Sequence, residues 1–306
     1  MTVLVNVIVT LGMLWVVPAG LRLIDPAGLR RAARLWPLPA ALGAVCLWLP
    51  RGALATTLAA LYAAACLALA ARAPAALLRG REPGPARRTP PGPADIAVAT
   101  ALVSPSVAGT ALVAERAGFR LFGFDLDILA LTVPHFHFAG FTAALVAGLV
   151  CRAAAPGPGA RWAAYSVPAG TLLVLLGYFV GDWAELVGAV VLTGGMWAVA
   201  LTTWREIRPA GRDRTTRALL AGSAAVLVAT MLLALWWAAG EATGIVHPTL
   251  TWMAATHGLG NALGFALCSV LAWRRLTADT GAGATAGTTA GTPARTAAAA
   301  RQEITP

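Results

Sequence analysis

The sequence predicts an all-α, polytopic transmembrane helix bundle of about nine spans, with its N-terminus outside the cell and its C-terminus in the cytoplasm. Of the 306 residues, 58% are hydrophobic and only 12% are charged, compared with roughly 25% charged in an ordinary soluble domain. The mean hydropathy is +0.72. The apolar residues form long runs, and arginines cluster between these runs. The pattern favours one membrane domain over separate water-soluble cores.

The spans follow from the length of each run, because crossing a bilayer takes roughly 20 apolar residues, with a usual range of about 17 to 25. The first run has no basic leader and no small-residue cleavage site, so we expect a retained helix. The second run is the shortest and contains several prolines. The predicted spans are 1–20, 35–50, 53–72, 94–114, 127–150, 162–181, 184–204, 217–240 and 249–273. A membrane domain over 1–276 is therefore expected, followed by a disordered cytoplasmic tail over 277–306, which is poor in bulky apolar residues.

The arginines predict the orientation, since basic residues in short loops stay on the cytoplasmic side. Nine spans with an outer N-terminus leave only Arg51, Arg116 and Arg120 outside. The net charge of +10 is thus explained by membrane topology. Because the basic residues are not gathered on one face, no nucleic-acid partner is expected. All basic residues are Arg and none is Lys, which with abundant Ala, Gly and Pro is typical of GC-rich bacterial genomes, and we expect a multi-pass protein of a bacterial cell membrane.

Three histidines fall inside predicted spans, where an ionisable side chain is costly and indicates function by default. His135 and His257 each lie about 12 Å from the outer end of their helix. His137 is one step deeper, and residues two apart on a helix point about 200° from one another. We therefore expect one of this pair to face a cavity and the other a neighbouring helix, unless Pro134 distorts the turn. The alternative is that the histidines only hydrogen-bond between helices.

Asn261 shares a helix face with His257, four residues earlier. Glycines at positions 258, 260 and 264 flank this pair and allow close helix approach. The segment Ser104-Pro105-Ser106 lies at a comparable depth in its own span and predicts a kink. These segments are expected to converge on one polar cavity that opens toward the outer leaflet.

Acidic residues lie near the outer ends of the predicted helices. Asp182 and Glu185 are three apart, share a helix face and occupy a very short turn. Glu241 lies at the outer end of a later span. Complementing the dipole at a helix N-terminus is the simpler explanation for such residues, and contributing acid groups to the cavity is the functional one.

Two segments carry a family resemblance. Leu131-Thr132-Val133-Pro134-His135-Phe136-His137-Phe138-Ala139-Gly140-Phe141 resembles the His-Phe-His-aromatic-Ala-Gly-Phe segment of the YndJ-like bacterial integral membrane proteins. Thr256-His257-Gly258-Leu259-Gly260-Asn261-Ala262-Leu263-Gly264-Phe265 is similar to the second signature of that family. The resemblance covers about residues 90–275. It implies a shared membrane fold in which the two histidine segments belong together, and it implies no particular reaction.

Three function classes remain open. The first is a membrane enzyme that uses acid/base residues on a lipophilic small molecule, such as a cyclase or isomerase of specialised metabolism, without a cofactor. Its candidate catalytic residues are His135, His137, His257, Asn261, Asp182, Glu185 and Glu241. The second is a protein that binds a metal ion or haem at His137 and His257. The third is a proton-coupled transporter. In all three the lipid bilayer is the surrounding partner.

Overall fold

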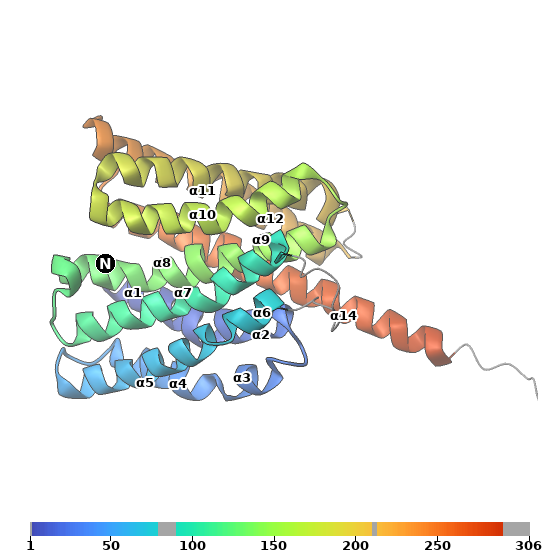
Figure 1. The fold of residues 1–306 in the computed structure, drawn as a ribbon, viewed down its shortest axis with the longest axis horizontal. Coiled ribbons are helices and arrows are strands. Elements are labelled where there is room, and N and C mark those ends of the chain that lie inside the picture. The colour runs from blue at the N-terminus through green and yellow to red at the C-terminus, as the bar shows by residue number, and fades with distance from the viewer. Residues whose placement is uncertain (1, 79–89, 210–212, 290–306) are drawn as a thin grey trace, which may run out of the picture.

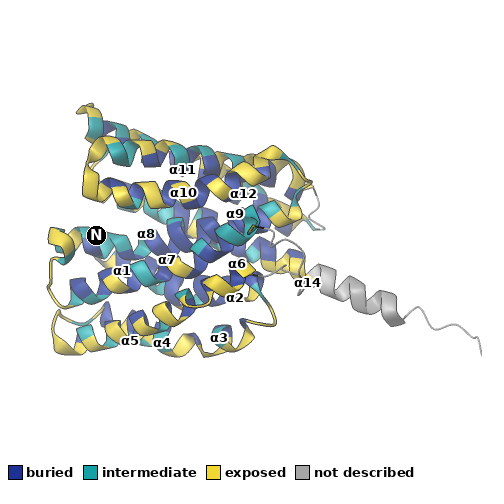
Figure 2. Cartoon of the chain, in the orientation of Figure 1, coloured by how far each residue is buried: buried dark blue, intermediate teal, exposed yellow. Residues whose placement is uncertain are grey.

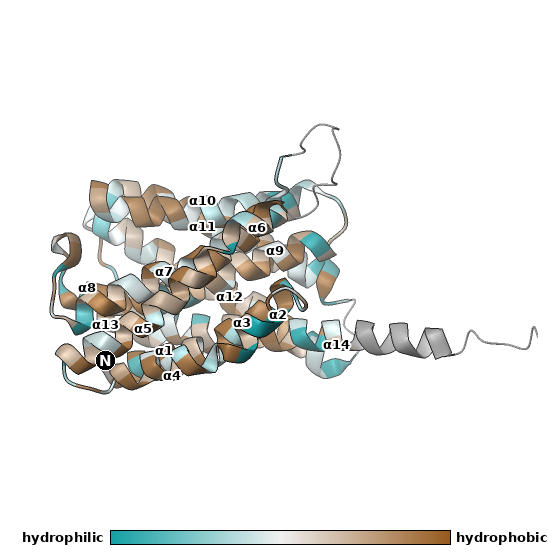
Figure 3. Cartoon of the chain, turned by 60° about the horizontal axis from the view of Figure 1, so that its bottom comes forward, coloured by the Kyte–Doolittle hydropathy of each residue, from teal (hydrophilic) through white to brown (hydrophobic). Residues whose placement is uncertain are grey.

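The computed structural model describes residues 2–78, 90–209 and 213–289, and within them 279–289 as backbone only. In these ranges the chain is helical and contains no strand. The helices run roughly parallel or antiparallel in one elongated bundle (Figure 1). Hydrophobic residues cover the length of the bundle, and hydrophilic residues gather toward its ends (Figure 3). The fold confirms the all-α membrane bundle.

Eight helical segments of the described chain are long and apolar enough to cross a membrane, one fewer than the nine expected. Several are composed of two or more consecutive helical elements. The segments are Val3–Ile24 (α1 Thr2–Leu11, η1 Gly12–Val16, α2 Val17–Ile24), Ala53–Leu78 (α5 Ala53–Ala70, α6 Ala73–Leu78), α7 Pro93–Arg116, Leu126–Ala153 (α8 Leu126–His135, η3 Phe136–Thr142, α9 Ala143–Ala153), α10 Pro158–Val180, Asp182–Ile207 (α11 Asp182–Thr202, η4 Thr203–Ile207), α12 Arg214–Thr243 and Leu250–Ala278 (α13 Leu250–Met253, η5 Ala254–Gly258, η6 Gly260–Leu267, start of α14 Cys268–Thr289).

The missing ninth span is the one expected at 35–50. Its apolar helix, α4, covers only Pro37–Cys46, because it is separated from α3, Arg30–Leu35, at Trp36. The two short helices nevertheless return the chain along the first span. Trp36 Nε1 donates to the Met13 carbonyl at 2.9 Å, and Asn6 Nδ2 donates to the Leu47 carbonyl at 2.9 Å. Pro37 lies at the start of α4, and the preceding helix α3 carries Arg30, Arg31 and Arg34, so the apolar stretch is short.

The C-terminal helix continues past the expected domain boundary at residue 276. α14 extends to Thr289, and the rest of the expected tail, 290–306, lies outside the described residues.

The span Leu126–Ala153 lies at the centre of the bundle. It is the most buried of the spans, with 78% of its apolar window inside the protein, against 33% for α12 and for the final span. Figure 2 shows buried residues concentrated along α9, whereas α8 is mostly of intermediate exposure and the outer helices carry more exposed residues. Ser104 of α7 lies so close to Gly140 that a Cβ there would come within 2.8 Å of it. The first signature segment is therefore the packing core of the fold.

Candidate functional site

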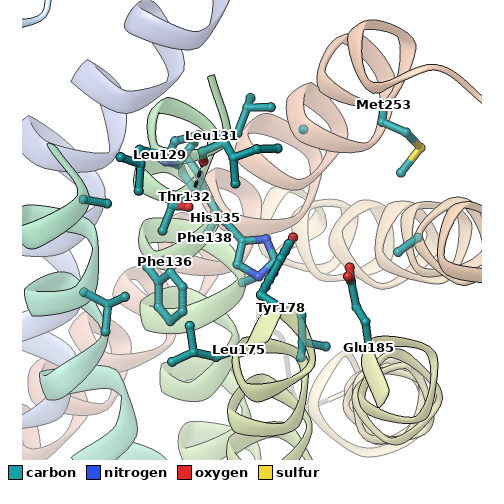
Figure 4. A pocket seen from close by; sticks show the side chains of 18 of the residues that line it. Leu129, Leu131, Thr132, His135, Phe136, Phe138, Leu175, Tyr178, Glu185 and Met253 are labelled. Carbon is teal, nitrogen blue, oxygen red and sulfur yellow. Dashed lines mark hydrogen bonds between the residues drawn. The ribbon is translucent and has the colours of Figure 1, made fainter. Parts of the chain in front are cut away.

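A cavity of about 440 Å³ lies between α7, α8, α10, α11, α12 and the final span. Ligand sites usually have volumes of about 300 to 1,000 Å³ and mostly apolar walls with a few polar groups. Most of the lining here is Leu, Ile, Val, Ala, Met and Phe. Figure 4 shows side chains from these separate elements projecting into one space. The polar side chains of the lining are Ser106, Thr110, Thr132, His135, Tyr178, Glu185, Trp237, His257 and Asn261.

His135 is the member of the His-Phe-His pair that faces this cavity. It is the last residue of α8, and the chain widens into the π-helix η3 at the next residue. Pro134 lacks an amide hydrogen and cannot continue the regular bonding pattern of α8. In Figure 4 the rings of His135 and Tyr178 and the carboxylate of Glu185 all point into the cavity.

His137 faces the opposite way and is fully buried. Its Nδ1 lies 2.7 Å from the Val133 carbonyl, and its Nε2 lies 2.6 Å from the Tyr62 hydroxyl in α5. Because a carbonyl only accepts, Nδ1 carries the proton and the Tyr62 hydroxyl donates to Nε2. His137 thus joins η3 to α5, as the expected 200° separation from His135 requires. A metal ion or haem bound at His137 would have to displace one of these two bonds, because each ring nitrogen already has a partner.

His257 forms a second network, at the cavity wall. Its Nδ1 lies 2.8 Å from the Thr230 carbonyl, and its Nε2 lies 3.0 Å from Asn261 Nδ2. The Thr230 hydroxyl donates to Asn261 Oδ1 at 2.8 Å. The carbonyl requires a proton on Nδ1, so Nε2 of the neutral ring accepts from the Asn261 amide. Both the orientation and the tautomer of His257 are fixed by residues of α12 and η6.

Both signature segments coincide with widened helical turns. The first contains η3 and the second contains η5 and η6, all of them π-helical. Such turns are rare and are frequently found at functional sites. In η3 the Thr142 hydroxyl donates to the His137 carbonyl, five residues earlier, at 3.0 Å. Together with η1 of the first span, η3 and η6 contact one another in the interior of the bundle.

Glu185 is the acidic residue that lines the cavity. α11 follows α10 after the single residue Gly181, whose φ of 136° favours glycine. Close helix approach continues from this turn, since a Cβ on Gly177 would lie 2.5 Å from the Glu185 Cα. A tight α10–α11 hairpin therefore holds the Glu185 carboxyl against the cavity.

Asp182 and Glu241 do not belong to the lining. Asp182 is exposed at the start of α11, and Glu241 forms an ion pair with His247 Nε2 at 3.2 Å. Both are nevertheless within electrostatic range of Glu185. The cavity thus combines four of the seven predicted site residues, His135, His257, Asn261 and Glu185, with Asp182 and Glu241 nearby and His137 on the far side of η3.

The sequence analysis did not predict three residues in or next to the site, namely Tyr178, Thr132 and Tyr62. Tyr178 is in α10, one turn before Gly181, and lies within electrostatic range of Glu185 and Glu241. Tyr62 is the single Tyr of the Ala-rich helix α5. Its position in that otherwise small-residue helix is the sequence feature that could have indicated a structural or functional role. In the chain that the structure describes, no group of three or more His, Cys, Asp or Glu residues is arranged to hold a metal ion. Chemically, the site offers two imidazoles, one carboxyl and one phenol on an apolar wall, which suits proton transfer to and from a lipophilic molecule.

Comparisons with known proteins agree with this architecture. The model of the YndJ-like protein family matches residues 7–265, which includes both signature segments. A Bacillus subtilis (strain 168) protein with the printed description "Uncharacterized membrane protein YndJ" is 26% identical over 162 residues. That match covers 53% of this chain and 29% of the relative, so the aligned part of this chain spans less than a third of that protein. No solved structure matches. Since the family model covers most of its length, the chain belongs to the YndJ-like family of membrane proteins.

Proposed function

We propose that this membrane protein is an acid/base catalyst that isomerises or cyclises a lipophilic molecule in the cavity. The observation that supports the proposal is the placement of the ionisable groups. His135, His257 and Glu185 come from three different spans and line one apolar cavity of about 440 Å³. Ionisable residues within membrane spans are energetically costly and usually functional. Packing alone therefore does not account for three of them on one apolar wall.

The proposed reaction is a balanced proton shuttle. The Glu185 carboxyl, in its protonated form, donates its proton to one carbon of a carbon–carbon double bond in the substrate. The electron pair of that bond takes the proton and leaves a cationic carbon. His135 then removes a proton from the neighbouring carbon, so that a new double bond forms and the substrate is isomerised. Return of the proton from His135 to Glu185 regenerates the site, and no cofactor is consumed.

The surroundings of the cavity suit a cationic intermediate. Trp237 and Tyr178 present aromatic rings to the lining, and aromatic faces attract cations most strongly where water is excluded. His257 supplies a second base whose orientation is fixed by Asn261 and Thr230. Its neutral Nε2 can bind a substrate proton only after releasing the Asn261 amide, so we assign His257 and Asn261 to positioning and His135 to proton removal.

Solvent deuterium provides the test, because the substrate is not needed in advance. The protein is purified in mild detergent with its co-purifying lipids and incubated in D₂O, and extracted lipids are analysed by mass spectrometry. We expect one lipophilic species to gain deuterium at carbon. Loss of a general acid or base typically costs about 10²- to 10⁴-fold in rate, so His135→Gln and Glu185→Gln should abolish the labelling.

The matched control is Glu206→Gln, which removes an exposed carboxyl outside the cavity lining and should leave labelling unchanged. Circular dichroism and gel filtration check that each variant is folded. Labelling that matches a protein-free sample, or labelling that persists in both His135→Gln and Glu185→Gln, would refute the proposal.

A further inference from the structure

We infer that the cavity takes one amphiphile, a lipid with a zwitterionic head that carries a phosphate and an amine, and that the head binds at a second, charged cavity on its rim. The inference rests on the proposed function only in naming its substrate class. The two cavities are adjoining, because Ile128 and Leu250 line both. The charged residues of the second cavity are Arg51, Arg120, Asp125 and Asp127.

The depth of the apolar cavity fits a lipid chain. Its lining follows the central span from Ile128 to Phe138, ten residues that rise about 15 Å. Half of a hydrocarbon core about 30 Å thick is the same length. A chain that enters at the rim therefore reaches His135, and a head attached to it remains at the level of the charged cavity.

The charged residues of the rim form ion pairs, and after this pairing one positive charge and one negative charge remain uncompensated. Arg116 is committed to the buried Glu115 and to the Cys46 and Leu49 carbonyls, at 3.3 and 3.1 Å. Arg51 contacts the same carboxylate, at 2.9 Å, while its side chain stays 48% exposed. Two guanidinium groups on one carboxylate leave a net positive charge on the Arg51 side.

The negative centre is at the start of α8. Arg120 pairs with Asp125, and both are exposed, so this pair is neutral overall. Asp127 then adds one negative charge beside it. A head with a phosphate for Arg51 and an ammonium for Asp127 complements both centres, whereas a purely anionic head would meet the Asp127 carboxylate as a like charge.

Aromatic residues of the apolar lining cluster where α10 ends and α8 begins. Phe124 contacts Phe179 and Tyr178 with ring centroids 5.4 and 6.2 Å apart, and Phe122 contacts Phe179 at 5.5 Å. Aromatic rings commonly occupy the membrane interface, where an apolar region meets a polar one. This is the level at which a lipid passes from chain to head.

Native mass spectrometry in mild detergent tests the inference with three single-chain lipids of equal length that differ in the head. The heads are phosphoethanolamine, which is zwitterionic, phosphoglycerol, which is anionic, and glycerol, which is neutral. We expect one phosphoethanolamine lipid per chain, bound about two- to fivefold more tightly than the phosphoglycerol lipid, which is the range of an exposed ion pair. The tail-free glycerophosphoethanolamine should not bind.

Two variants and a control assign the parts of the site. Asp127→Asn should remove the preference for phosphoethanolamine over phosphoglycerol. Ala139→Trp, which fills the apolar cavity, should abolish stoichiometric binding. Glu206→Gln, an exposed acid that lines neither cavity, should change nothing.

Equal binding of all three heads, or an unchanged preference in Asp127→Asn, would overturn the rim site. Binding that survives Ala139→Trp would place the lipid elsewhere on the protein and overturn the inference as a whole. These outcomes are separate from the proposed chemistry. A lipid that binds as expected but gains no deuterium would refute catalysis alone, and deuterium in a lipid without such a head would refute the inference alone.

Discussion

The hydrogen bond between Tyr62 and His137 links spans that are 75 residues apart, and its removal has a predictable cost. Tyr62→Phe deletes only the hydroxyl. The phenyl ring that remains keeps its edge-to-face contact with Trp36, at 5.9 Å, and its stacking on His137, at 6.0 Å. The change therefore isolates the bond from the packing around it.

The magnitude follows from burial. Interhelical hydrogen bonds in membrane proteins average about 0.6 kcal/mol and reach about 1.7 kcal/mol. Tyr62 and His137 are both 0% exposed, and the partner left behind, Nε2 of His137, has no water to replace the lost donor. An unsatisfied buried group costs about 1 to 3 kcal/mol. We expect Tyr62→Phe to lower the free energy of unfolding by about 1 to 2 kcal/mol.

A double-mutant cycle measures the coupling energy between Tyr62 and His137. The four proteins are the original, Tyr62→Phe, His137→Leu and the double variant, each unfolded by increasing SDS in mixed micelles. We expect a coupling energy of about 1 kcal/mol. Because neither residue lines the cavity, deuterium labelling should survive in Tyr62→Phe. A coupling below about 0.3 kcal/mol, or loss of labelling without loss of stability, would refute the structural role given to this pair.

Three further predictions address other parts of the fold. Gly188→Ala would bring a Cβ within 2.5 Å of the Val174 amide nitrogen, whereas Gly194 has open space in the same helix. SDS unfolding should show that Gly188→Ala lowers the free energy of unfolding by about 1 to 3 kcal/mol and that Gly194→Ala leaves it unchanged. Equal effects of the two substitutions would contradict the tight α10–α11 contact. Hydrogen bonds from the backbone amide and hydroxyl of Thr216 lower the pKa of Asp213, the N-cap of α12, to about 2. Since this folded pKa lies below the ordinary value of 3.8, the stabilisation from the Asp213 carboxylate should be complete above about pH 4 and disappear as pH falls toward 2. An acid-unfolding profile that Asp213→Asn leaves unchanged would count against this contribution. Finally, ¹⁵N spectra of histidine-labelled protein should show His257 as the neutral tautomer with its proton on Nδ1, and the opposite tautomer would exclude the Thr230–Asn261 network.

The spans were predictable because their length and hydropathy are local properties of the chain. The exception is the helix expected at 35–50, whose length depends on where a proline-containing segment breaks. Its return along the first span is fixed by hydrogen bonds at the Met13 and Leu47 carbonyls, and the periodicity of the sequence does not indicate such long-range bonds. The boundary at residue 276 follows from the scarcity of bulky apolar residues after it, whereas α14 continues to Thr289.

Depth along the helix predicted part of the site. His135 and His257 were placed at one level from residue counts alone, and the structure brings both to one cavity. The choice between His135 and His137 could not be made, because it depends on which neighbouring helix carries Tyr62. Asp182 and Glu185 share a helix face, yet only Glu185 reaches the lining, because the close approach at Gly177 fixes the rotation of α11.

The π-helical segment η3 also has a consequence for how this chain can change its length. Each π turn accommodates one residue more than the corresponding α turn, so η3 acts as an inserted residue in the middle of the central span. Deleting one residue between Phe136 and Thr142 would therefore restore α geometry and keep the rotation of α9 relative to α8, whereas a deletion within α9 would turn the rest of that helix by about 100°. The buried face of α9 would then rotate away from its neighbours. The central span is thus expected to tolerate the loss of one residue in η3 better than the loss of one residue in α9.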